Sequence, residues 1–465
     1  MDAEAFSESL AYPQVKKRAV ASRSFRTKIS PSNGGSFVSG STINIDLPGN
    51  LAGQYYNPNQ MYLKFSVTGA AAYTLDRGGA TGFIKRIQIQ TAGAQLFDLN
   101  NWNVLACALL DTDSSSEWKA SSGNIMLGTL GDQLQGVSVA AATKRTYCIP
   151  MMLNPLSMTT PHRMIPAFSL SALQFKITLD TTASSVKTAA AAVPFVFDDI
   201  EMVCLMTELS PGAQAQIDQL TGGQYNILAN SYINSQGNVA AAATQVTANL
   251  GVSVSSLERI IVVHRPELTV DAFASFSLGN RSTRNLSQFQ FLINSENYPQ
   301  RPIDVGDHGA EAFAEMLLAD HSLVDFRKGC PIQNSFGVGA LVQIPAADTA
   351  GIGTGALSGN FPGAAKTDAY MDDVGTGSSA GAVTLGAIPT ASNIGTFLCA
   401  CEFESGLSDG KSSHIYSGIS TISSTVQYKG TYGAGGLATS LDFFSMYTLM
   451  ISLDMKGSSV FAVSV

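Results

Sequence analysis

The sequence predicts an all-β protein of two tandem antiparallel jelly rolls, each with eight strands and a short helix. Three observations support this fold class. Short runs of alternating apolar and polar residues recur along the 465-residue chain, turns rich in glycine and proline separate them, and only two short stretches have helical spacing. A parallel β/α fold would need a helix of roughly 10–15 residues between most strands.

Residues 31–209 are expected to form the first roll. The run Ile43-Asn44-Ile45-Asp46-Leu47 shows the alternation typical of its strands. A short helix is expected at 101–111, where Asn101 can cap it and Leu105, Ala108 and Leu109 share one face. Strands are expected near 36–38, 42–47, 61–67, 83–90, 94–97, 145–149, 168–170, 173–179 and 195–205.

Residues 210–223 are mostly small and polar, with Pro211-Gly212 near one end and Gly222-Gly223 at the other. This composition predicts a linker between two domains. Residues 224–465 are expected to form the second roll. Its helix is predicted near 309–319, with Asp307 as a possible cap and Phe313, Met316 and Leu317 on one face. Its strands are expected near 225–233, 257–264, 272–278, 289–293, 338–344, 397–403, 415–428 and 442–455.

The same succession occurs in both halves. Residues 87–111 give an alternating strand, a turn, a second short strand and a helix, and residues 289–319 give the same succession about 205 positions later. Each half also ends in a long apolar strand that carries acids. Identity between the halves is low, so the similarity is one of architecture.

Residues 345–395 of the second roll are dominated by Gly, Ala, Thr, Ser and Asp. A loop this long inside a compact domain is usually functional, and a tolerated insertion is the alternative. The whole chain is 45% hydrophobic but only 13% charged. The surface of a chain with so few charged residues must be covered by uncharged polar residues or be buried against other copies of the chain.

Residues 1–30 lack a consistent period and are expected to form a basic N-terminal arm. The six basic residues, with no acid between the first and the last, are Lys16, Lys17, Arg18, Arg23, Arg26 and Lys28. The chain as a whole has a net charge of −8. Such an arm could contact nucleic acid or an acidic neighbour without sequence preference, or it could be a solvated terminus.

The sequence shows no convincing enzyme chemistry, so we expect no catalytic residue, no cofactor and no metal site. Gly377-Ser378-Ser379-Ala380-Gly381 matches the nucleophile-elbow pattern, but it lies in the long loop and not at a strand-to-helix turn. The five histidines have no metal-site spacing. Asp198-Asp199 and Asp372-Asp373 could bind calcium, but solvated strand edges are the favoured explanation.

The six cysteines form no CxxC pair and most lie in apolar runs, which indicates buried free thiols. The N-terminus has no secretory signal, and no run is long and apolar enough to span a membrane. We therefore expect a protein made inside a cell and not secreted.

The chain from residue 31 to 465 resembles the double jelly-roll major capsid proteins of tailless icosahedral viruses, including the polinton-like, virophage, adintovirus and adenovirus groups. The resemblance rests on the basic arm, the two rolls, the small linker, the long loops and one segment, Asn294-Ser295-Glu296-Asn297-Tyr298-Pro299-Gln300-Arg301-Pro302-Ile303. This segment is the part of the resemblance that extends to sequence.

The resemblance implies a structural protein of the virion. Homotrimers would present six upright rolls as a pseudo-hexameric capsomer, and capsomers would pack into an icosahedral shell around the genome. Residues 345–395 would crown the exterior. The arm would face the interior, toward the genome or an internal membrane, and penton or minor capsid proteins would be further partners.

Two other functions fit an all-β chain. A different assembly subunit, such as a spike or fibre, would lack the pseudo-sixfold arrangement. A carbohydrate-binding or glycan-cleaving jelly roll would need surface aromatics and a carboxylate pair in a groove. The only two tryptophans, Trp102 and Trp118, both lie near the first expected helix, which speaks against this function.

Overall fold

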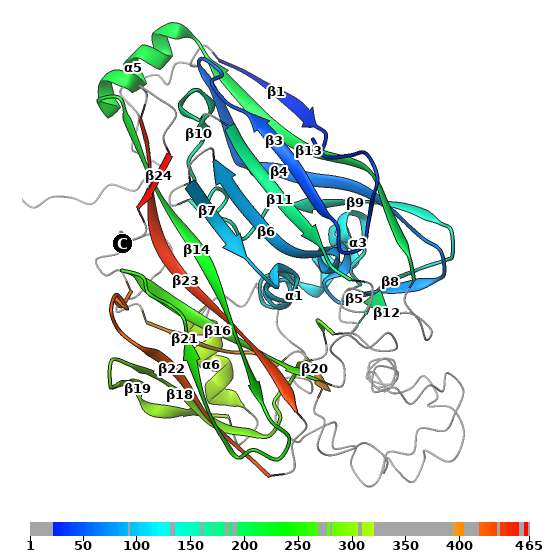
Figure 1. The fold of residues 1–465 in the computed structure, drawn as a ribbon, viewed down its shortest axis with the longest axis vertical. Coiled ribbons are helices and arrows are strands. Elements are labelled where there is room, and N and C mark those ends of the chain that lie inside the picture. The colour runs from blue at the N-terminus through cyan, green and yellow to red at the C-terminus, as the bar shows by residue number, and fades with distance from the viewer. Residues whose placement is uncertain are drawn as a thin grey trace, which may run out of the picture.

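The computed structural model contains two antiparallel β-sandwiches joined by one helix (Figure 1). The structure describes residues 22–463 except for two long stretches, 320–393 and 404–417, and short ones at 92–93, 131–134, 160–161, 171, 182–185, 188–192, 268–276, 280, 306–308, 396, 435–437 and 455–459. The expected strand at 338–344 and residues 345–393 of the expected long loop lie outside the described residues.

Roll one is built on two facing sheets. One sheet has the order β1-β13-β4-β9, and the other has the order β3-β11-β6-β7. The strands of these sheets are β1 (Ser22–Ile29), β3 (Thr42–Pro48), β4 (Gln54–Gly69), β6 (Ile84–Thr91), β7 (Ala94–Leu99), β9 (Lys144–Pro150), β11 (Ala172–Leu179) and β13 (Phe195–Leu209).

Roll two repeats this plan. Its sheets have the orders β14-β23-β16-β21 and β15-β22-β18-β19. The strands are β14 (Gln224–Val239), β15 (Gln245–Leu250), β16 (Leu257–Pro266), β18 (Leu286–Ile293), β19 (Glu296–Asp304), β21 (Cys399–Glu402), β22 (Val426–Tyr432) and β23 (Thr439–Asp454).

The two rolls have the same topology. Counted along each roll, the sheets join the first, eighth, third and sixth strands, and the second, seventh, fourth and fifth strands. This is the eight-stranded jelly roll, in which two Greek keys interleave. The predicted fold class is therefore confirmed, and the two similar successions in the sequence correspond to β6, β7 and a helix, and to β18, β19 and a helix.

The helix that follows the fifth strand of each roll is α1 (Trp102–Asp113) in roll one and α6 (Ala310–Ala319) in roll two, as predicted. The remaining elements extend or connect the two sandwiches. They are β2 (Phe37–Val38), β5 (Tyr73–Asp76), η2 (Gly79–Phe83), α2 (Ser116–Ala120), α3 (Ser122–Leu127), β8 (Gln135–Val139), β10 (Ile165–Pro166), η3 (Ala167–Ser169), β12 (Val186–Lys187), α5 (Pro211–Thr221), β17 (Arg281–Ser282), β20 (Ile394–Gly395) and β24 (Val460–Val463).

Several local predictions were wrong. The expected arm contains β1, which pairs along its whole length with β13 and is the first strand of roll one. The expected linker contains α5, which Ser210 caps by accepting the N–H of Ala213 at 3.4 Å. The expected strand at 168–170 overlaps the 3-10 helix η3, and the strand expected from 415 begins at Val426.

Aromatic side chains fill the space between the sheets of each roll. In roll one, the ring of Phe83 lies 5.4 Å from Phe197, 5.6 Å from Phe195 and 6.3 Å from Phe65, and these contacts are edge-on. In roll two, Phe291 and Tyr428 lie between the two sheets, with their ring centres 5.7 Å apart. Edge-to-face pairs add to the stabilisation from burial, so each roll has its own core.

Replacing Phe83 by alanine should lower the free energy of unfolding by about 3–5 kcal/mol, because the ring is buried among other rings and leaves a cavity. Urea unfolding followed by intrinsic fluorescence measures this change. Val38→Ala is the matched control, since Val38 is 59% exposed and its loss should change stability by no more than about 0.5 kcal/mol. Equal effects of the two substitutions would contradict the assignment of Phe83 to the core.

Candidate assembly surfaces and the junction between the rolls

A buried carboxylate at the end of α1 joins the two rolls. Asp111 accepts hydrogen bonds from Arg77 and Lys119 of roll one and from Arg281 of roll two, and Lys119 Nζ lies 2.8 Å from Asp111 Oδ1. No side chain of these four is more than 5% exposed. Asp111 therefore gathers three cations from both rolls in a site without solvent contact.

The charge of Asp111 is maintained by these neighbours. Burial alone would raise the pKa of the carboxyl group, but the positive charges of Arg77, Lys119 and Arg281 outweigh it and lower the pKa below the usual range. The carboxylate thus stays ionised at neutral pH. Removing it would leave three cations together in a buried site.

A second carboxylate, Asp76 at the end of β5, binds backbone of roll two. Its oxygens accept the N–H groups of Leu278 at 2.8 Å and Gly279 at 2.9 Å, together with the N–H of Arg77. Burial raises the pKa of Asp76 to about 6, although these N–H groups and the charge of Arg281 act in the opposite direction. Asp76 therefore titrates near neutral pH while Asp111 does not.

A third carboxylate, Asp442 in β23, joins the rolls from the other side. Its Oδ1 accepts a 2.7 Å hydrogen bond from Asn101 Nδ2, in the turn before α1, and its Oδ2 accepts hydrogen bonds from Nη2 and Nε of Arg265 in β16 at 2.7 and 3.0 Å. Gln236 Nε2 of β14 also reaches it at 3.3 Å. Asp442 is fully buried. Its ion pair with Arg265 lies within roll two, and Asn101 adds a hydrogen bond from roll one.

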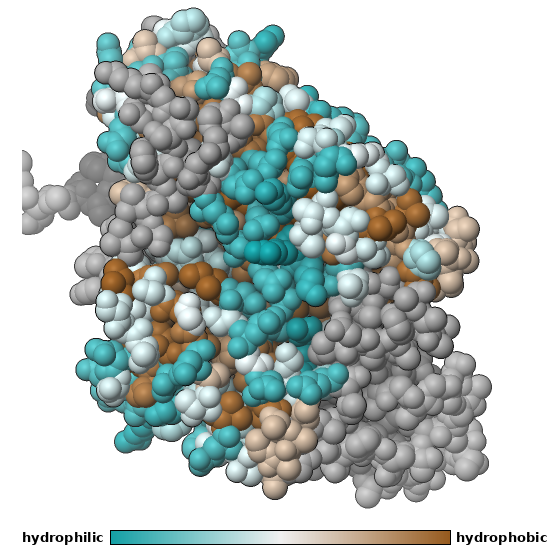
Figure 2. Space-filling model, in the orientation of Figure 1, coloured by the Kyte–Doolittle hydropathy of each residue, from teal (hydrophilic) through white to brown (hydrophobic). Residues whose placement is uncertain are grey.

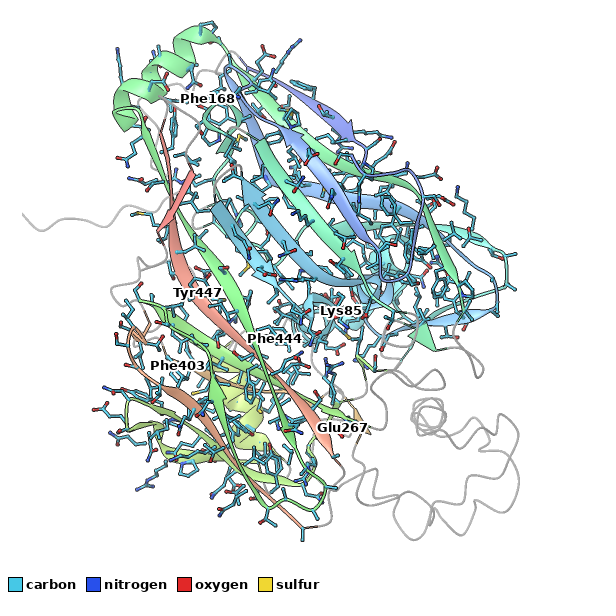
Figure 3. The ribbon with its side chains drawn as sticks, in the orientation of Figure 1. Lys85, Phe168, Glu267, Phe403, Phe444 and Tyr447 are labelled. Carbon is cyan, nitrogen blue, oxygen red and sulfur yellow. The ribbon has the colours of Figure 1, made fainter. Side chains whose placement is uncertain are left out.

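These contacts show which faces of the rolls meet. The outer face of the β14-β23-β16 sheet of roll two packs on β7 and on the turn before α1 in roll one. Phe444 lies on the same face of β23 as Asp442 by strand alternation, and it lies at the centre of the molecule (Figure 3). Asn230 N donates to Met158 O at 3.0 Å farther along β14. The rolls are thus fixed in one relative orientation.

The described basic residues of the predicted arm do not form a separate arm. Arg23 Nε lies 2.7 Å from Glu208 Oε2 and Lys28 Nζ lies 3.1 Å from Glu201 Oε2, both across the β1-β13 pair. Arg26 is exposed and has no ion pair among the described residues. Lys16, Lys17 and Arg18 lie outside the described residues.

Both outer faces of roll one are polar. The face of the β3-β11-β6-β7 sheet is mainly uncharged and polar, and it forms the hydrophilic band across the centre of the space-filling view (Figure 2). Gln90 donates to Gln174, which in turn donates to Asp46, both at 2.6 Å. The same face carries the ion pair of Arg86 in β6 with Asp98 in β7, at 2.5 Å, and the opposite face, of β1, β13, β4 and β9, carries ion pairs such as Lys144–Asp199 at 2.6 Å.

The acidic pairs do not form a calcium site in the described structure. Asp199 is paired with Lys144 and accepts a hydrogen bond from Ser66 at 3.3 Å, while Asp372-Asp373 lie outside the described residues. Within the described ranges, no group of three acidic, histidine or cysteine residues could hold a metal ion. No described helix is long and apolar enough to cross a membrane.

Five of the six cysteines are described, and all five are free thiols. Burial raises the pKa of Cys107 and Cys204 to about 12. Four of the five are buried and Cys148 is half-buried, which agrees with the predicted thiols.

The sequence did not identify the junction residues. Asp76, Asp111 and Arg281 are single charges in ordinary contexts, and they meet only because topology places α1 beside roll two. One signal was available: Asp111 directly follows the apolar residues 104–110 of α1, and a charge that is buried needs a partner.

Replacing Asp111 by asparagine should lower the free energy of unfolding by about 3–5 kcal/mol, because three buried cations lose their counter-charge. Chemical denaturation at neutral pH measures the loss. Asp46→Asn, on the exposed face of β3, is the matched control and should cost less than about 1 kcal/mol. A loss at position 111 no larger than at position 46 would contradict the role of the cluster.

Asp76 should give the junction a distinct pH dependence. The folded protein keeps the Asp76 proton up to about pH 6 while the unfolded chain releases it near 3.8, so folding takes up a proton between these values. The Asp76 contribution to the free energy of unfolding should fall by about 3 kcal/mol as pH rises through this window. Urea unfolding of the wild type and of Asp76→Asn at several pH values between 3.8 and 6 measures this change. If the two proteins differed in free energy of unfolding by the same amount at every pH, the prediction would be contradicted.

Comparison with known proteins supports the fold without a sequence match. No protein-family model and no curated protein matches the chain. Among solved structures, a quasi-atomic PBCV-1 virus capsid model matches with a TM-score of 0.56 and 10% identity over 98% of this chain and 99% of that one. The Faustovirus major capsid protein matches with a TM-score of 0.55 and 10% identity over 96% of this chain and 93% of that one.

A third match is the cryo-EM structure of the Sputnik virophage, with a TM-score of 0.55 and 10% identity over 100% of this chain and 93% of that one. Identity this low shows the fold alone, but the coverage extends over both rolls and their connection. The strand order and the matches agree, and the chain has the double jelly-roll fold seen in these viral capsid structures.

Proposed function

We propose that the chain is a major capsid protein that associates as trimers and builds an icosahedral shell. The observation that carries this proposal is the repetition of one strand order in two rolls that a buried junction holds together. Two equivalent sandwiches in one rigid chain supply two of the six positions of a pseudo-hexagonal unit. Three copies complete it through one repeated contact.

The composition supports a protein that buries much surface against its own copies. Only 13% of the residues are charged, although the chain is long enough for a large exposed area. The cores of subunit interfaces are depleted of charged residues, so a low charge content fits an extensive interface. The function is mechanical: the shell encloses a genome by repeating one set of protein–protein contacts.

Contact with the genome or an internal membrane, and with penton or minor capsid proteins, is a further part of this proposal. Because β1 belongs to roll one, an inward-facing basic segment would consist of Lys16, Lys17 and Arg18 and not of the whole group up to Lys28. A truncation that tests this segment should end before Ser22, since a longer one removes a strand.

The carbohydrate-binding alternative loses support. Trp102 is fully buried in α1, and Trp118 packs partly buried against the core, so neither offers an exposed stacking platform. Within the described chain, the carboxylates at the centre of the molecule hold the rolls together and do not line an open groove. A spike or fibre subunit would not explain why both rolls share one topology.

The oligomeric state tests the proposed function. Light scattering coupled to size-exclusion chromatography should give three times the 48.8 kDa chain mass at micromolar concentration, or larger closed shells. Dilution should not release monomer readily, since obligate interfaces are large and apolar. A stable monomer at these concentrations would contradict the capsid proposal.

A further inference from the structure

One histidine is fully enclosed in roll two. His264, in β16, is buried, and it is paired across the sheet with Leu441 of β23. Its ring centre is 6.1 Å from that of Tyr432 in β22, which belongs to the facing sheet (Figure 1). The imidazole therefore points into the space between the two sheets of roll two, and none of the described junction contacts uses it.

The surroundings of this imidazole favour its neutral form. Nε2 of His264 lies 3.1 Å from Oη of Tyr432, which in turn lies 3.2 Å from Oη of Tyr428. The ring of Phe397 is 5.6 Å away. Nδ1 has no hydrogen-bond partner among the described residues. Both nitrogens of an imidazolium carry an N–H group, and an unpaired donor on a buried charged ring costs more than an unpaired acceptor on a neutral one.

The charge that acts on His264 is positive. Arg284, in the turn before β18, is buried and holds its guanidinium over the ring of Tyr432, 5.0 Å from the ring centre. Its Nη2 and Nη1 donate to the backbone oxygens of Ala240 and Ala243 at 2.7 and 2.9 Å, which hold the cation in place. A protonated His264 would therefore meet a like charge. Burial first, and Arg284 second, lower the pKa of His264 to about 3.

The other titratable groups that face this space do not compensate for a positive charge. Tyr428 and Tyr432 of β22 and Cys399 of β21 are uncharged in acid, because burial raises the pKa of each. Asp442 of β23 points to the opposite side of its sheet, where Asn101 of roll one binds it. In the described part of the chain, no carboxylate forms an ion pair with the histidine.

Two further elements pack on β16, and their charges act elsewhere. Arg281 of β17 donates to Asp111 across the junction. The charge of Glu315 in α6 acts on the thiol of Cys401, which is paired with Ile260 farther along β16. A proton on the enclosed imidazole therefore has no counter-charge among the described residues.

Opening of roll two is thus linked to the uptake of a proton. In the closed roll His264 stays neutral down to about pH 3, whereas in contact with water it binds a proton near its ordinary pKa of 6.5. The opened form binds more protons between these values, so the stability that the neutral ring supports is present above pH 6.5 and is lost as the pH falls. Each pH unit below 6.5 should raise the equilibrium constant for opening by about tenfold.

The junction responds to acid in the opposite direction. Burial raises the pKa of Asp76 to about 6, so the folded junction gains stability relative to the unfolded chain as the pH falls from 6 toward 3.8. Asp111 stays ionised over this range, because its three cations lower its pKa. Acid thus weakens the interior of roll two and not the contact between the rolls, which localises its effect.

We propose that His264 makes roll two the acid-responsive half of the chain: in mild acid its protonation opens the space between the two sheets of this roll while the junction with roll one stays closed. The inference concerns a single chain and does not depend on the proposed trimer. In a shell, it would confine the first effect of acidification to one of the two rolls in every subunit.

The chain contains its own reporters of opening. Cys399 is a buried thiol in β21, which pairs with β16, so a reagent reaches it only when roll two opens. Cys107 is a buried thiol of α1 whose pKa is raised by burial and then by the charge of Asp111, so it reports opening of the junction. A dipyridyl disulfide labels thiols in acid as well as at neutral pH. Labelling in sub-denaturing urea, followed by peptide mass spectrometry, gives the rate at each cysteine.

His264→Gln tests the sensor, because glutamine keeps a polar group beside Tyr432 and does not titrate. The labelling rate at Cys399 in the wild type, divided by the rate in this variant, should rise by about tenfold for each pH unit between about pH 6 and 4. The division cancels the chemistry of the reagent and the titration of every other group. Cys107 should be labelled about tenfold more slowly than Cys399, or slower still, at about pH 5, since the junction stays closed.

His162→Gln is the matched control, because His162 is exposed in a loop of roll one and its loss should leave the pH dependence at Cys399 unchanged. Circular dichroism at neutral pH checks that each variant is folded. If the glutamine variant is not, His264→Phe replaces it, since a phenyl ring fills the same space without titrating. The wild type alone gives a further measure: the ratio of the Cys399 rate to the Cys107 rate should rise as the pH falls.

Two results would overturn the inference. A ratio of wild-type to variant rates at Cys399 that does not change with pH would show that His264 is not the sensor. Equal labelling rates at Cys399 and Cys107 in acid would show that the whole chain opens together and not roll two alone. Neither result concerns the oligomeric state, so this inference and the proposed function succeed or fail separately.

Discussion

The relative orientation of the two rolls depends on carboxylates buried between them. Asp111 lies between cations from both rolls, Asp76 binds the backbone of roll two, and Asp442 pairs with Arg265 while it accepts a hydrogen bond from Asn101. Each group is costly to bury alone, and each gains a partner from the other roll only when the rolls meet in this arrangement. A purely apolar contact would tolerate sliding or rotation far better. The polar junction therefore converts two separately folded sandwiches into one rigid building unit.

This constraint links fold to assembly. A shell built from one repeated contact needs subunits whose shape does not vary, because small errors in orientation accumulate around a ring. Aromatic side chains fill the space between the two sheets of each roll. The buried junction fixes the angle between the two rolls.

Sequence patterns predicted the fold class and the helices α1 and α6 because these depend on local periodicity, whereas the small residues of 210–223 suggested a linker and α5 was missed. The alternation in β6 and β18 and the short helices α1 and α6 were visible as residue spacing. Strand β1 was missed because its basic residues suggested an arm, although Phe25, Thr27 and Ile29 alternate inward. The junction could not be predicted, because Asp111 and Arg281 are 170 residues apart and meet only through tertiary topology.

The most direct measurement of the central claim is a single-particle electron-microscopy reconstruction of the purified, assembled protein. The account predicts a threefold particle with six upright sandwiches in a pseudo-hexagonal outline, in which the spacing between rolls of one chain resembles that between chains. A fibre, or a ring whose rolls splay at variable angles within each chain, would contradict it.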